Sequence, residues 1–363
     1  MKLKKLILKN YRNYENFEYN FSFDKTLIIG KNAQGKTNIL EAIYYLCALD
    51  SNRIRKDLEL INFESDFCTI KAQIEKNDTE IDLEVLINPP RNKILKVNGL
   101  KKNKSADFLR VLSSVNFSSS DLLLLRGEPS NRRKWLDLAI FQVYPLYLEK
   151  LSKFNKIRLQ KANYLQTNKI DNNMLDVFNH QLATASANVV FLRMKYLKEL
   201  SRIAKVKHKS MADSENLTIN YITQVSDYST IVELEEKIYL KLNQTKQEEI
   251  RRTQCLIGAH RDDIDFFING VDSKKYASQG QQRTIVLALK LSELQIIKDK
   301  TKHTPILLLD DVLAELDNIR QNYLLSSIDE DIQMIITSVD TLAFDNKFLN
   351  NVDIIKIANG KML

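Results

Sequence analysis

The chain has 363 residues, of which 44% are hydrophobic, and a formal net charge of +8. This length is enough for two or three hydrophobic cores, and no stretch approaches the ~20 consecutive apolar residues that cross a membrane. The charge favours an anionic partner, most often nucleic acid, although a lysine-rich composition alone gives the same excess. Lys9 interrupts the apolar N-terminal run, which argues against a signal peptide. Three scattered cysteines, Cys47, Cys68 and Cys255, fit neither a disulfide framework nor a metal cluster, so we expect a soluble cytoplasmic protein.

Near the N-terminus, the apolar patterns predict strands over 3–8, 14–21 and 26–29 and a helix over 38–46. A phosphate-binding P-loop, G-x-x-x-x-G-K-T, lies between the last strand and the helix. Its residues are Gly30, Lys31, Asn32, Ala33, Gln34, Gly35, Lys36 and Thr37. In such a loop the backbone N–H groups surround the phosphates, the lysine reaches the terminal phosphates, and the threonine hydroxyl ligates Mg²⁺. Two glycines at this spacing, in a chain with only 8, argue against a chance match.

Beyond a basic segment at 50–56, alternating patterns predict strands over 67–76, 79–87 and 93–97. Asn98-Gly99, Asn269-Gly270 and Asn359-Gly360 each predict a tight hairpin turn. From 118 to 253 glycine nearly vanishes and apolar residues take helical spacing, which predicts a helical insertion. We expect Pro129 and Pro145 to cut its first part into short helices. The runs 174–206 and 230–249 indicate long amphipathic helices, with an isolated strand over 217–222 between them.

Toward the C-terminus a strand is expected over 264–268, and Ser278, Gln279, Gly280 and Gln281 then precede a helix expected to start at 284. This segment resembles the signature motif of ABC-type ATPases, although an ordinary helix N-cap explains the same residues. The buried run 306–309 ends in Asp310 and Asp311, the pattern of a Walker B strand. There Asp310 would hold Mg²⁺ and Asp311 would orient or deprotonate the attacking water. The alternative is a core strand that stops at an acidic turn.

Asp317, in the segment 314–317, stands at the spacing of the ABC D-loop, and a strand over 333–338 should end near the γ phosphate. That strand carries Thr337-Ser338 where transporter ATPases usually present a histidine, and Asp311 replaces the usual glutamate. Both departures predict slow hydrolysis, so that ATP binding matters more than turnover. A chain with one P-loop and one signature needs a second copy, joined head to tail, to complete each site. We therefore expect an ATP-dependent homodimer with two-fold symmetry.

Taken together, the ordered motifs resemble the RecF family of recombinational repair ATPases. They include Leu8–Tyr14, the P-loop with its continuation to Ala42, Phe117–Leu122, Gly127–Asp137, Gly258–Asp263, the signature and Leu308–Asp317. Ser119-Ser120 replaces the family's usual Pro-Glu, and Ala259 replaces a proline. The resemblance implies an ATP-dependent DNA-binding dimer that favours single-strand to double-strand junctions and gapped DNA. It also implies a weak, DNA-stimulated ATPase that works in DNA replication and the SOS response, with RecR and RecO loading RecA at stalled forks.

The residues that would meet DNA are the least defined. The candidates are the basic clusters Arg53, Arg55, Lys56; Lys101, Lys102, Lys104; and Arg132, Arg133, Lys134. Lysine and arginine bind phosphates without reading sequence, so we expect salt-sensitive binding. The alternative interpretation is that each cluster is a solvated surface that does not contact DNA. His260 and Arg261 either support the nucleotide site or are structural.

The predicted fold is an α/β ABC-type P-loop ATPase head with antiparallel β additions and an inserted α-helical arm. Residues 1–117 and 254–363 would form the head, and residues 118–253 the arm. Two other classes share the core motifs. A transporter ATPase has closer motifs and the switch histidine, and an SMC-like chromosome-organising protein needs much longer coiled-coil arms.

Overall fold

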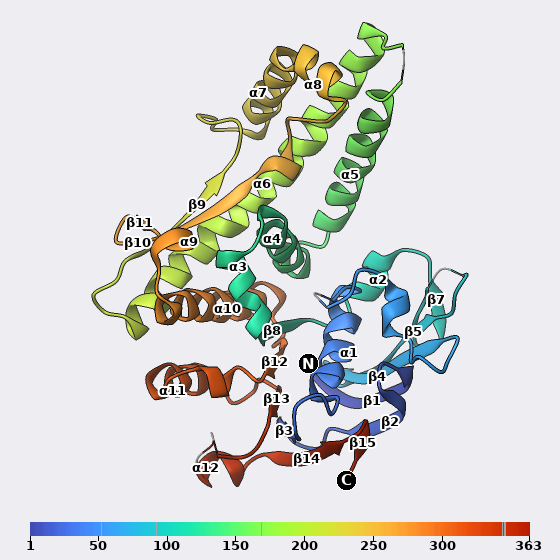
Figure 1. The fold of residues 1–363 in the computed structure, drawn as a ribbon, viewed down its shortest axis with the longest axis vertical. Coiled ribbons are helices and arrows are strands. Elements are labelled where there is room, and N and C mark those ends of the chain that lie inside the picture. Colours follow the sequence, from blue (N-terminus) through green and yellow to red (C-terminus); the bar gives the residue numbers. More distant parts are fainter. Residues whose placement is uncertain (52, 92, 168, 343, 345) are drawn as a thin grey trace. The chain divides into compact units, whose positions relative to one another are not determined.

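The computed structural model describes residues 1–51, 53–91, 93–167, 169–342, 344 and 346–363. They form two compact units, coloured along the chain in Figure 1. The first unit joins the two chain ends, Met1–Asp121 and Lys290–Leu363, and the second is Leu122–Leu289. The chain therefore leaves the first unit once and returns to it within a single helix, α10 (Gln279–Thr301).

The first unit contains a largely parallel six-stranded sheet, in the order β15-β14-β3-β13-β12-β8. The strands are β3 (Lys25–Ile29), β8 (Ser114–Ser118), β12 (Ile306–Asp310), β13 (Met334–Ser338), β14 (Asp353–Ala358) and the antiparallel edge strand β15 (Lys361–Met362). The central strands β3, β12 and β13 are almost wholly apolar and buried, as expected for parallel strands that are covered on both faces. Helix α1 (Lys36–Ala48) packs against β8, β12 and β13. The loop that connects β3 to α1 consequently lies at the carboxyl ends of these strands, where ligands bind open α/β sheets.

An antiparallel six-stranded sheet completes this unit, in the order β2-β1-β4-β5-β6-β7. Its strands are β1 (Lys2–Tyr11), β2 (Tyr14–Asn20), β4 (Cys68–Lys76), β5 (Thr79–Ile87), β6 (Ile94–Val97) and β7 (Leu100–Lys102). The two sheets are joined through Gln333, whose side chain accepts from the Leu3 N–H at 2.6 Å and donates to the Leu3 carbonyl at 2.8 Å. The remaining short helices of the unit are η1 (Asp57–Leu60), α2 (Ser105–Leu109), η2 (Ser119–Leu122), η4 (Leu313–Glu315), α11 (Asn318–Ser326) and α12 (Asn346–Leu349).

The second unit is mainly helical and is built on α6 (Asn172–Met211), a helix of 40 residues. Helices α5 (Tyr147–Tyr164) and α7 (Ile231–Gln244) pack along it. Beside α6 lies a small antiparallel sheet, β11-β10-β9, formed by β9 (Leu217–Ile222), β10 (Asp263–Ile268) and β11 (Val271–Asp272). The other helices are α3 (Leu123–Arg126), α4 (Pro129–Val143), α8 (Lys246–Arg252), η3 (Ala259–Arg261) and α9 (Ser273–Tyr276).

Most of the predicted elements are confirmed to within a few residues, including the strand before the P-loop, the helix after it and the long helix α6. The three Asn-Gly turns connect β6 to β7, β10 to β11 and β14 to β15. Asn98, Asn269 and Asn359 have φ angles of 51°, 51° and 49°, and each following glycine also has positive φ. This conformation is the one that a two-residue hairpin requires.

Several expectations were wrong in detail. The strand β9 is not isolated, because it pairs with β10. Some 40 residues separate the two strands in the sequence, so the local pattern does not reveal the pairing. The run 230–249 forms two helices, α7 and α8, and helices α4 and α5 are longer than the short helices predicted, at 15 and 18 residues. Helix α10 begins at Gln279 rather than at Thr284. The strand β8 was not predicted, and the helical insertion was expected to begin at its last residue.

The compact units differ from the predicted division at residues 118–121, which group with the first unit, and over residues 254–289, which group with the second unit. The reason for the second difference is that β10 pairs with β9 and contacts α4 and α9. The division into head and arm by function remains a prediction. Within the described ranges, none of the helices is both long enough and apolar enough to cross a membrane.

Candidate nucleotide-binding site

The P-loop connects β3 to α1, as predicted, and its backbone leaves little room for side chains. Gly35 has φ of +114°, and a Cβ at this position would lie 2.6 Å from Asn13 Nδ2. A Cβ on Gly30 would lie 2.4 Å from the carbonyl oxygen of Ile357. Ala33 also has a positive φ, 65°. The side chain of Lys36 is buried and donates to the carbonyls of Gly30 at 2.7 Å and Lys31 at 3.2 Å, so it lies across the concave side of the loop.

Residues outside the motif hold this loop in place. Asn13 Nδ2 donates to the Gln34 carbonyl at 3.0 Å, and the Tyr14 hydroxyl donates to the Gly35 carbonyl at 3.1 Å. From the other side, the N–H of Gly360 donates to the same Gln34 carbonyl at 3.1 Å. Sequence reasoning missed these supporting residues. The Asn359-Gly360 turn was recognised as a hairpin, but its contact with the P-loop depends on β14 lying beside β3.

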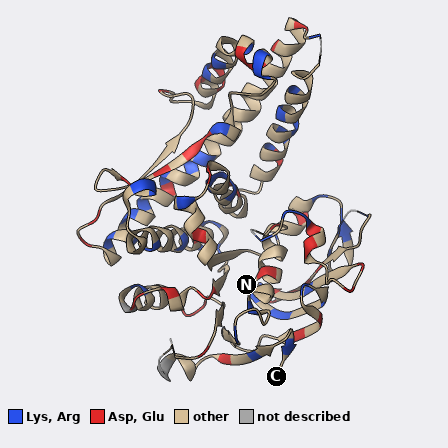
Figure 2. Cartoon of the chain, viewed as in Figure 1, with Lys and Arg blue, Asp and Glu red and all other residues tan. Residues whose placement is uncertain are grey.

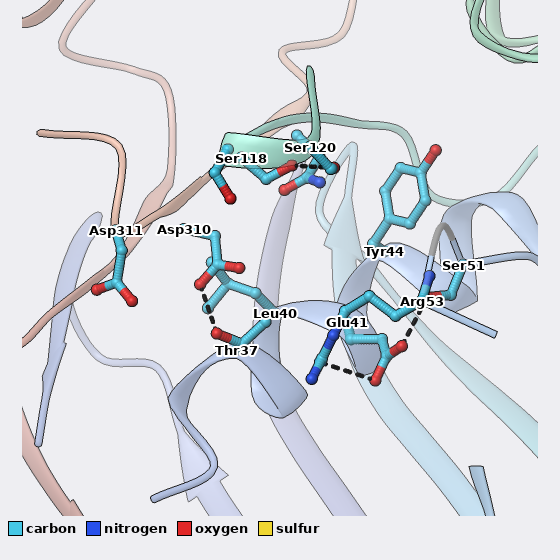
Figure 3. Close-up of a pocket in the computed structure, with 12 residues that line it drawn as sticks. Thr37, Leu40, Glu41, Tyr44, Ser51, Arg53, Ser118, Ser120, Asp310 and Asp311 are labelled. Carbon is cyan, nitrogen blue, oxygen red and sulfur yellow. Dashed lines mark hydrogen bonds and ion pairs between the residues drawn. The ribbon is translucent and has the colours of Figure 1, made fainter. Parts of the chain in front are cut away.

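Next to the loop, three side chains from α1, β12 and β13 meet at one oxygen atom. Thr37 Oγ1 and Thr337 Oγ1 each donate to Asp310 Oδ1 at 2.8 Å (Figure 3 draws the Thr37 bond). Thr337 Oγ1 in turn accepts from the Asp311 N–H at 2.9 Å. Thr37 and Asp310 are 273 positions apart in the chain. Their contact brings together the two residues predicted to hold Mg²⁺.

The two carboxylates at the end of β12 are in different environments. Burial raises the pKa of Asp310 above its usual value, while the hydrogen bonds from Thr337 and Thr37 work to lower it. Asp311 has a φ of 54°, an uncommon angle for a residue other than glycine. Its Oδ1 is buried and has no hydrogen-bond partner among the described residues. A buried acceptor of this kind is suited to a water molecule or another donor at the site.

A cavity of about 330 Å³ opens beside these carboxylates, within the first unit (Figure 3). It is lined by Thr37, Leu40, Glu41, Tyr44, Ser51, Arg53, Asn116, Ser118, Ser119, Ser120, Asp310 and Asp311. The Ser118 and Ser120 hydroxyls lie 2.7 Å apart, and the Ser118 N–H donates to Asp121 at 2.7 Å. The Ser119-Ser120 departure from the family pattern is therefore part of the cavity wall.

Glu41 is the centre of a polar network in this cavity. It accepts from Arg12 at 2.7 Å and 2.9 Å, from the Ser51 hydroxyl at 2.6 Å and from Arg53 at 3.3 Å. Burial works to raise the pKa of Glu41, but the hydrogen bonds from Arg12 and Ser51 and the charges of both arginines outweigh it, so the pKa lies below its usual value. Arg53 also donates to Asn38 at 2.8 Å. Arg53, a predicted DNA contact, is thus held at the nucleotide cavity.

The signature segment lies in the second unit, at the start of α10. Ser278 Oγ accepts from the Gln281 N–H at 3.2 Å, and Gln281 Oε1 accepts from the Ser278 N–H at 2.9 Å. This reciprocal pair is a capping box, the ordinary N-cap that was the alternative interpretation. Ser278 and Gln279 are exposed and Gly280 is half-buried. Asp317 of the D-loop segment is also exposed, and it caps α11 by accepting from the Arg320 N–H at 2.9 Å.

Of the basic clusters predicted to contact DNA, one is largely structural. Arg132 is buried, forms a two-bond ion pair with Asp263 at 2.6 Å and 3.0 Å, and donates to the Gly127 carbonyl at 2.7 Å. The structure therefore speaks against the prediction that Arg132 contacts DNA, because its guanidinium is buried and engaged by partners inside the unit. Arg133 is half-buried and donates to the Asp262 carbonyl at 2.7 Å, and Lys134 is also half-buried.

The other candidates remain on the surface. Arg55, Lys56, Lys101 and Lys104 are exposed, and Lys102 is half-buried. Figure 2 shows Lys and Arg spread over both units rather than gathered on one.

The segment around His260 has a structural role in the second unit. His260 Nε2 lies 3.0 Å from the Cys255 carbonyl, and burial lowers the pKa of His260 to about 4. Arg261 donates to the same carbonyl at 3.0 Å. Neither residue lines the cavity beside the P-loop. The N–H of Ala259 donates to Ser186 Oγ at 2.9 Å, a bond that the proline usual in the family cannot form.

Known proteins resemble this chain over nearly its whole length. Residues 2–362 match the family model described as the RecF/RecN/SMC N terminal domain. The DNA replication and repair protein RecF of Streptococcus gordonii is 40% identical over 364 residues, which cover 100% of each chain. The protein of the same name from Bacillus cereus is 38% identical over 367 residues, covering 99% of this chain and 98% of the relative.

A solved structure of the recombination mediator protein RecF-ATP in the RecFOR pathway superposes with a TM-score of 0.92. It is 31% identical and covers 99% of this chain and 96% of that chain. An Smc head bound to the C-winged helix domain of ScpA superposes with a TM-score of 0.57 at 15% identity, a likeness of fold alone. The predicted α/β ATPase-head fold is confirmed.

Proposed function

Because the chain belongs to the RecF family of DNA replication and repair proteins, we propose that it is an ATP-dependent DNA-binding protein of recombinational repair and replication-fork recovery, acting in the cytoplasm. The observation that carries the proposal is the contact of Thr37 with Asp310 at 2.8 Å, directly beside the P-loop. These two side chains come from opposite ends of the sequence, and phosphate-bound Mg²⁺ is the ligand that uses both.

The site is suited to ATP and Mg²⁺. The Lys36 ammonium group now donates to the carbonyls of Gly30 and Lys31. When ATP binds, a phosphate oxygen would replace these carbonyls as its acceptor. Thr37 and Asp310 supply the oxygen ligands that Mg²⁺ prefers, and the ion would neutralise charge on the terminal phosphates. The free buried oxygen of Asp311 is positioned to accept a hydrogen bond from water. Aspartate has a shorter reach than the usual glutamate, which supports slow hydrolysis that acts as a release step.

Two copies of the chain would complete each nucleotide site. The signature residues Ser278, Gln279 and Gly280 would contact the γ phosphate bound to the partner's P-loop, together with the D-loop residue Asp317. In the part of the chain that the structure describes, the backbone N–H groups of Gln279 and Gly280 have no hydrogen-bond partner, so they can face an anion. We infer that ATP joins two copies into a clamp that holds DNA, and that hydrolysis opens it.

We further propose that the clamp prefers single-strand gaps and junctions and acts with RecR and RecO in loading RecA. The support is family membership, and one related structure is described as a RecF-ATP complex in the RecFOR pathway. Arg55, Lys56 and Lys101 are exposed basic residues that we assign to the DNA phosphates, and the half-buried Lys102 and Lys134 are further candidates.

Sedimentation with a gapped DNA duplex tests the proposal, comparing ATP, ADP and no nucleotide. We expect ATP alone to produce a DNA-bound dimer, and Lys36→Met to abolish it. The matched control is Lys153→Met, which changes an exposed lysine of α5 and should behave as the wild type. The clamp proposal would be overturned if neither the oligomeric state nor the binding of DNA changed when ATP was added.

A further inference from the structure

The second unit contains a groove that the nucleotide mechanism does not use. It has a volume of about 760 Å³ and runs between α6 and β9, with the segment at 228–229 as a further wall. Phe191, Met194 and Ile219 are among its apolar lining residues. Phe191 is 40% exposed and Met194 37% exposed, and they lie three positions apart on α6, so the groove offers an apolar wall that is open to solvent. In Figure 1 the β9 arrow lies alongside the middle of α6.

One side of the groove is the open edge of a sheet. In the order β11-β10-β9, β9 has a partner on one side only. The Asn269 N–H donates to the Asn216 carbonyl at 3.0 Å, so the positions 218, 220 and 222 face β10 in the alternating antiparallel pattern. The backbone groups of Leu217, Ile219 and Tyr221 therefore point away from β10. Among the described residues, no hydrogen bond reaches them. An edge of this kind is a template for a further strand.

The helix that faces this edge is basic. Within the described residues, the charged side chains that line the groove are Lys195 and Lys198. Lys195 also lies over the Tyr144 ring at 5.4 Å. One and two turns further along the same face, Arg202 and Lys205 are exposed. In Figure 2, Lys and Arg recur along the helix that Figure 1 labels α6.

We propose that this groove binds an extended, acidic segment of a partner protein, which adds as a strand to the free edge of β9. Backbone hydrogen bonds to Leu217, Ile219 and Tyr221 would provide affinity. Alternate apolar side chains of the segment would enter the groove beside Phe191 and Met194. Its carboxylates would face the basic stripe of α6, formed by Lys195, Lys198, Arg202 and Lys205. The inference does not depend on the nucleotide site.

A protein segment fits the surface better than nucleic acid does. Phosphate binding needs only the basic stripe, and leaves unexplained both the exposed Phe191 and Met194 and the open backbone edge. A peptide strand uses all three features together.

The probe is a fluorescein-labelled synthetic peptide, Asp-Val-Glu-Ile-Asp-Phe-Glu, added to the full-length protein without nucleotide. We expect a saturable rise in fluorescence anisotropy. Two further peptides carry N-methyl groups on alternate residues. In one peptide the methyl groups block the N–H groups along one edge of the strand, and in the other peptide they block those along the opposite edge. Since only one edge of the added strand pairs with β9, one of these peptides should keep its affinity and the other should lose it. Hydrogen exchange should slow in 217–222 when the parent peptide binds.

Two protein variants separate the groove from general charge. We expect Lys198→Glu with Arg202→Glu to weaken binding about tenfold. Lys153→Glu with Lys156→Glu, the same change on exposed residues of α5, should leave binding intact. Met194→Ala should weaken binding without changing the salt dependence.

The proposal is overturned if both N-methylated peptides bind as the parent does, or if the two double variants weaken binding equally. It is also overturned if a single-stranded oligonucleotide displaces the peptide and Met194→Ala has no effect, because the surface would then serve nucleic acid.

Discussion

Thr337 supports the Walker B carboxylate, and Thr337→Val tests how much that support contributes. The substitution keeps the shape of the side chain but removes a hydrogen bond of 2.8 Å to Asp310 Oδ1 and the acceptor for the Asp311 N–H. When Thr37 turns to the metal ion in the proposed complex, Thr337 is the remaining threonine donor to this carboxylate. A hydrogen bond to a charged group contributes about 1.5–3 kcal/mol. At 1.4 kcal/mol per factor of ten, Mg²⁺-dependent ATP affinity should fall roughly 10- to 150-fold.

The effect should depend on pH in a defined direction. Burial already raises the pKa of Asp310, and the Thr337 hydrogen bond opposes that rise. Removing the bond raises the pKa further, so a smaller fraction of the carboxylate is ionised at a given pH. The affinity difference between variant and wild type should therefore be larger at pH 6 than at pH 8.

The assay is titration of a fluorescent ATP analogue in the presence and absence of Mg²⁺, at both pH values. Thr337→Ser keeps the hydroxyl and serves as the matched control, with affinity close to the wild type. Circular dichroism checks that each variant is folded. Wild-type affinity in Thr337→Val, or an equal loss in Thr337→Ser, would refute the role assigned to this hydroxyl.

Three further outcomes are expected. Asp310→Asn should abolish Mg²⁺-dependent ATP binding yet raise the melting temperature of the free protein by about 2–4 °C at pH 7, because a buried carboxylate with a raised pKa costs stability once it ionises. This gain in melting temperature should shrink toward pH 4, where the carboxylate is largely protonated. A melting temperature below that of the wild type at pH 7 would contradict this explanation. Gly35→Ala should remove ATP binding because its Cβ has no space, whereas Gly99→Ala, with the same sign of φ and open space, should bind ATP normally in the same titration. Lys161→Met should lower the unfolding free energy by about 3–5 kcal/mol, because it leaves the fully buried Glu249 without its ion-pair partner at 2.5 Å. In denaturant titrations, the double variant Lys161→Met with Glu249→Leu should recover much of that loss. Equal losses in the single and the double variant would count against the buried-charge explanation.

The sequence alone identified the parts of this protein that depend on local chemistry. The P-loop between a strand and a helix, the Walker B aspartates and the three Asn-Gly turns follow from backbone geometry over a few residues, and each lies where it was predicted. The apolar runs of β3, β12 and β13 were recognisable because parallel strands are buried on both faces.

Only the tertiary structure decided which distant residues meet. The pairing of β9 with β10, the bracing of Gln34 by Asn13 and Gly360, and the hydrogen bonds of Thr337 with Asp310 and Asp311 all join segments far apart in the chain. The basic clusters show the same limit. Arg132 and Arg55 look alike in sequence, but one is neutralised inside the unit by Asp263 and the other is exposed. A charged side chain carries no local signal of its partner, because that partner is set by how the elements pack.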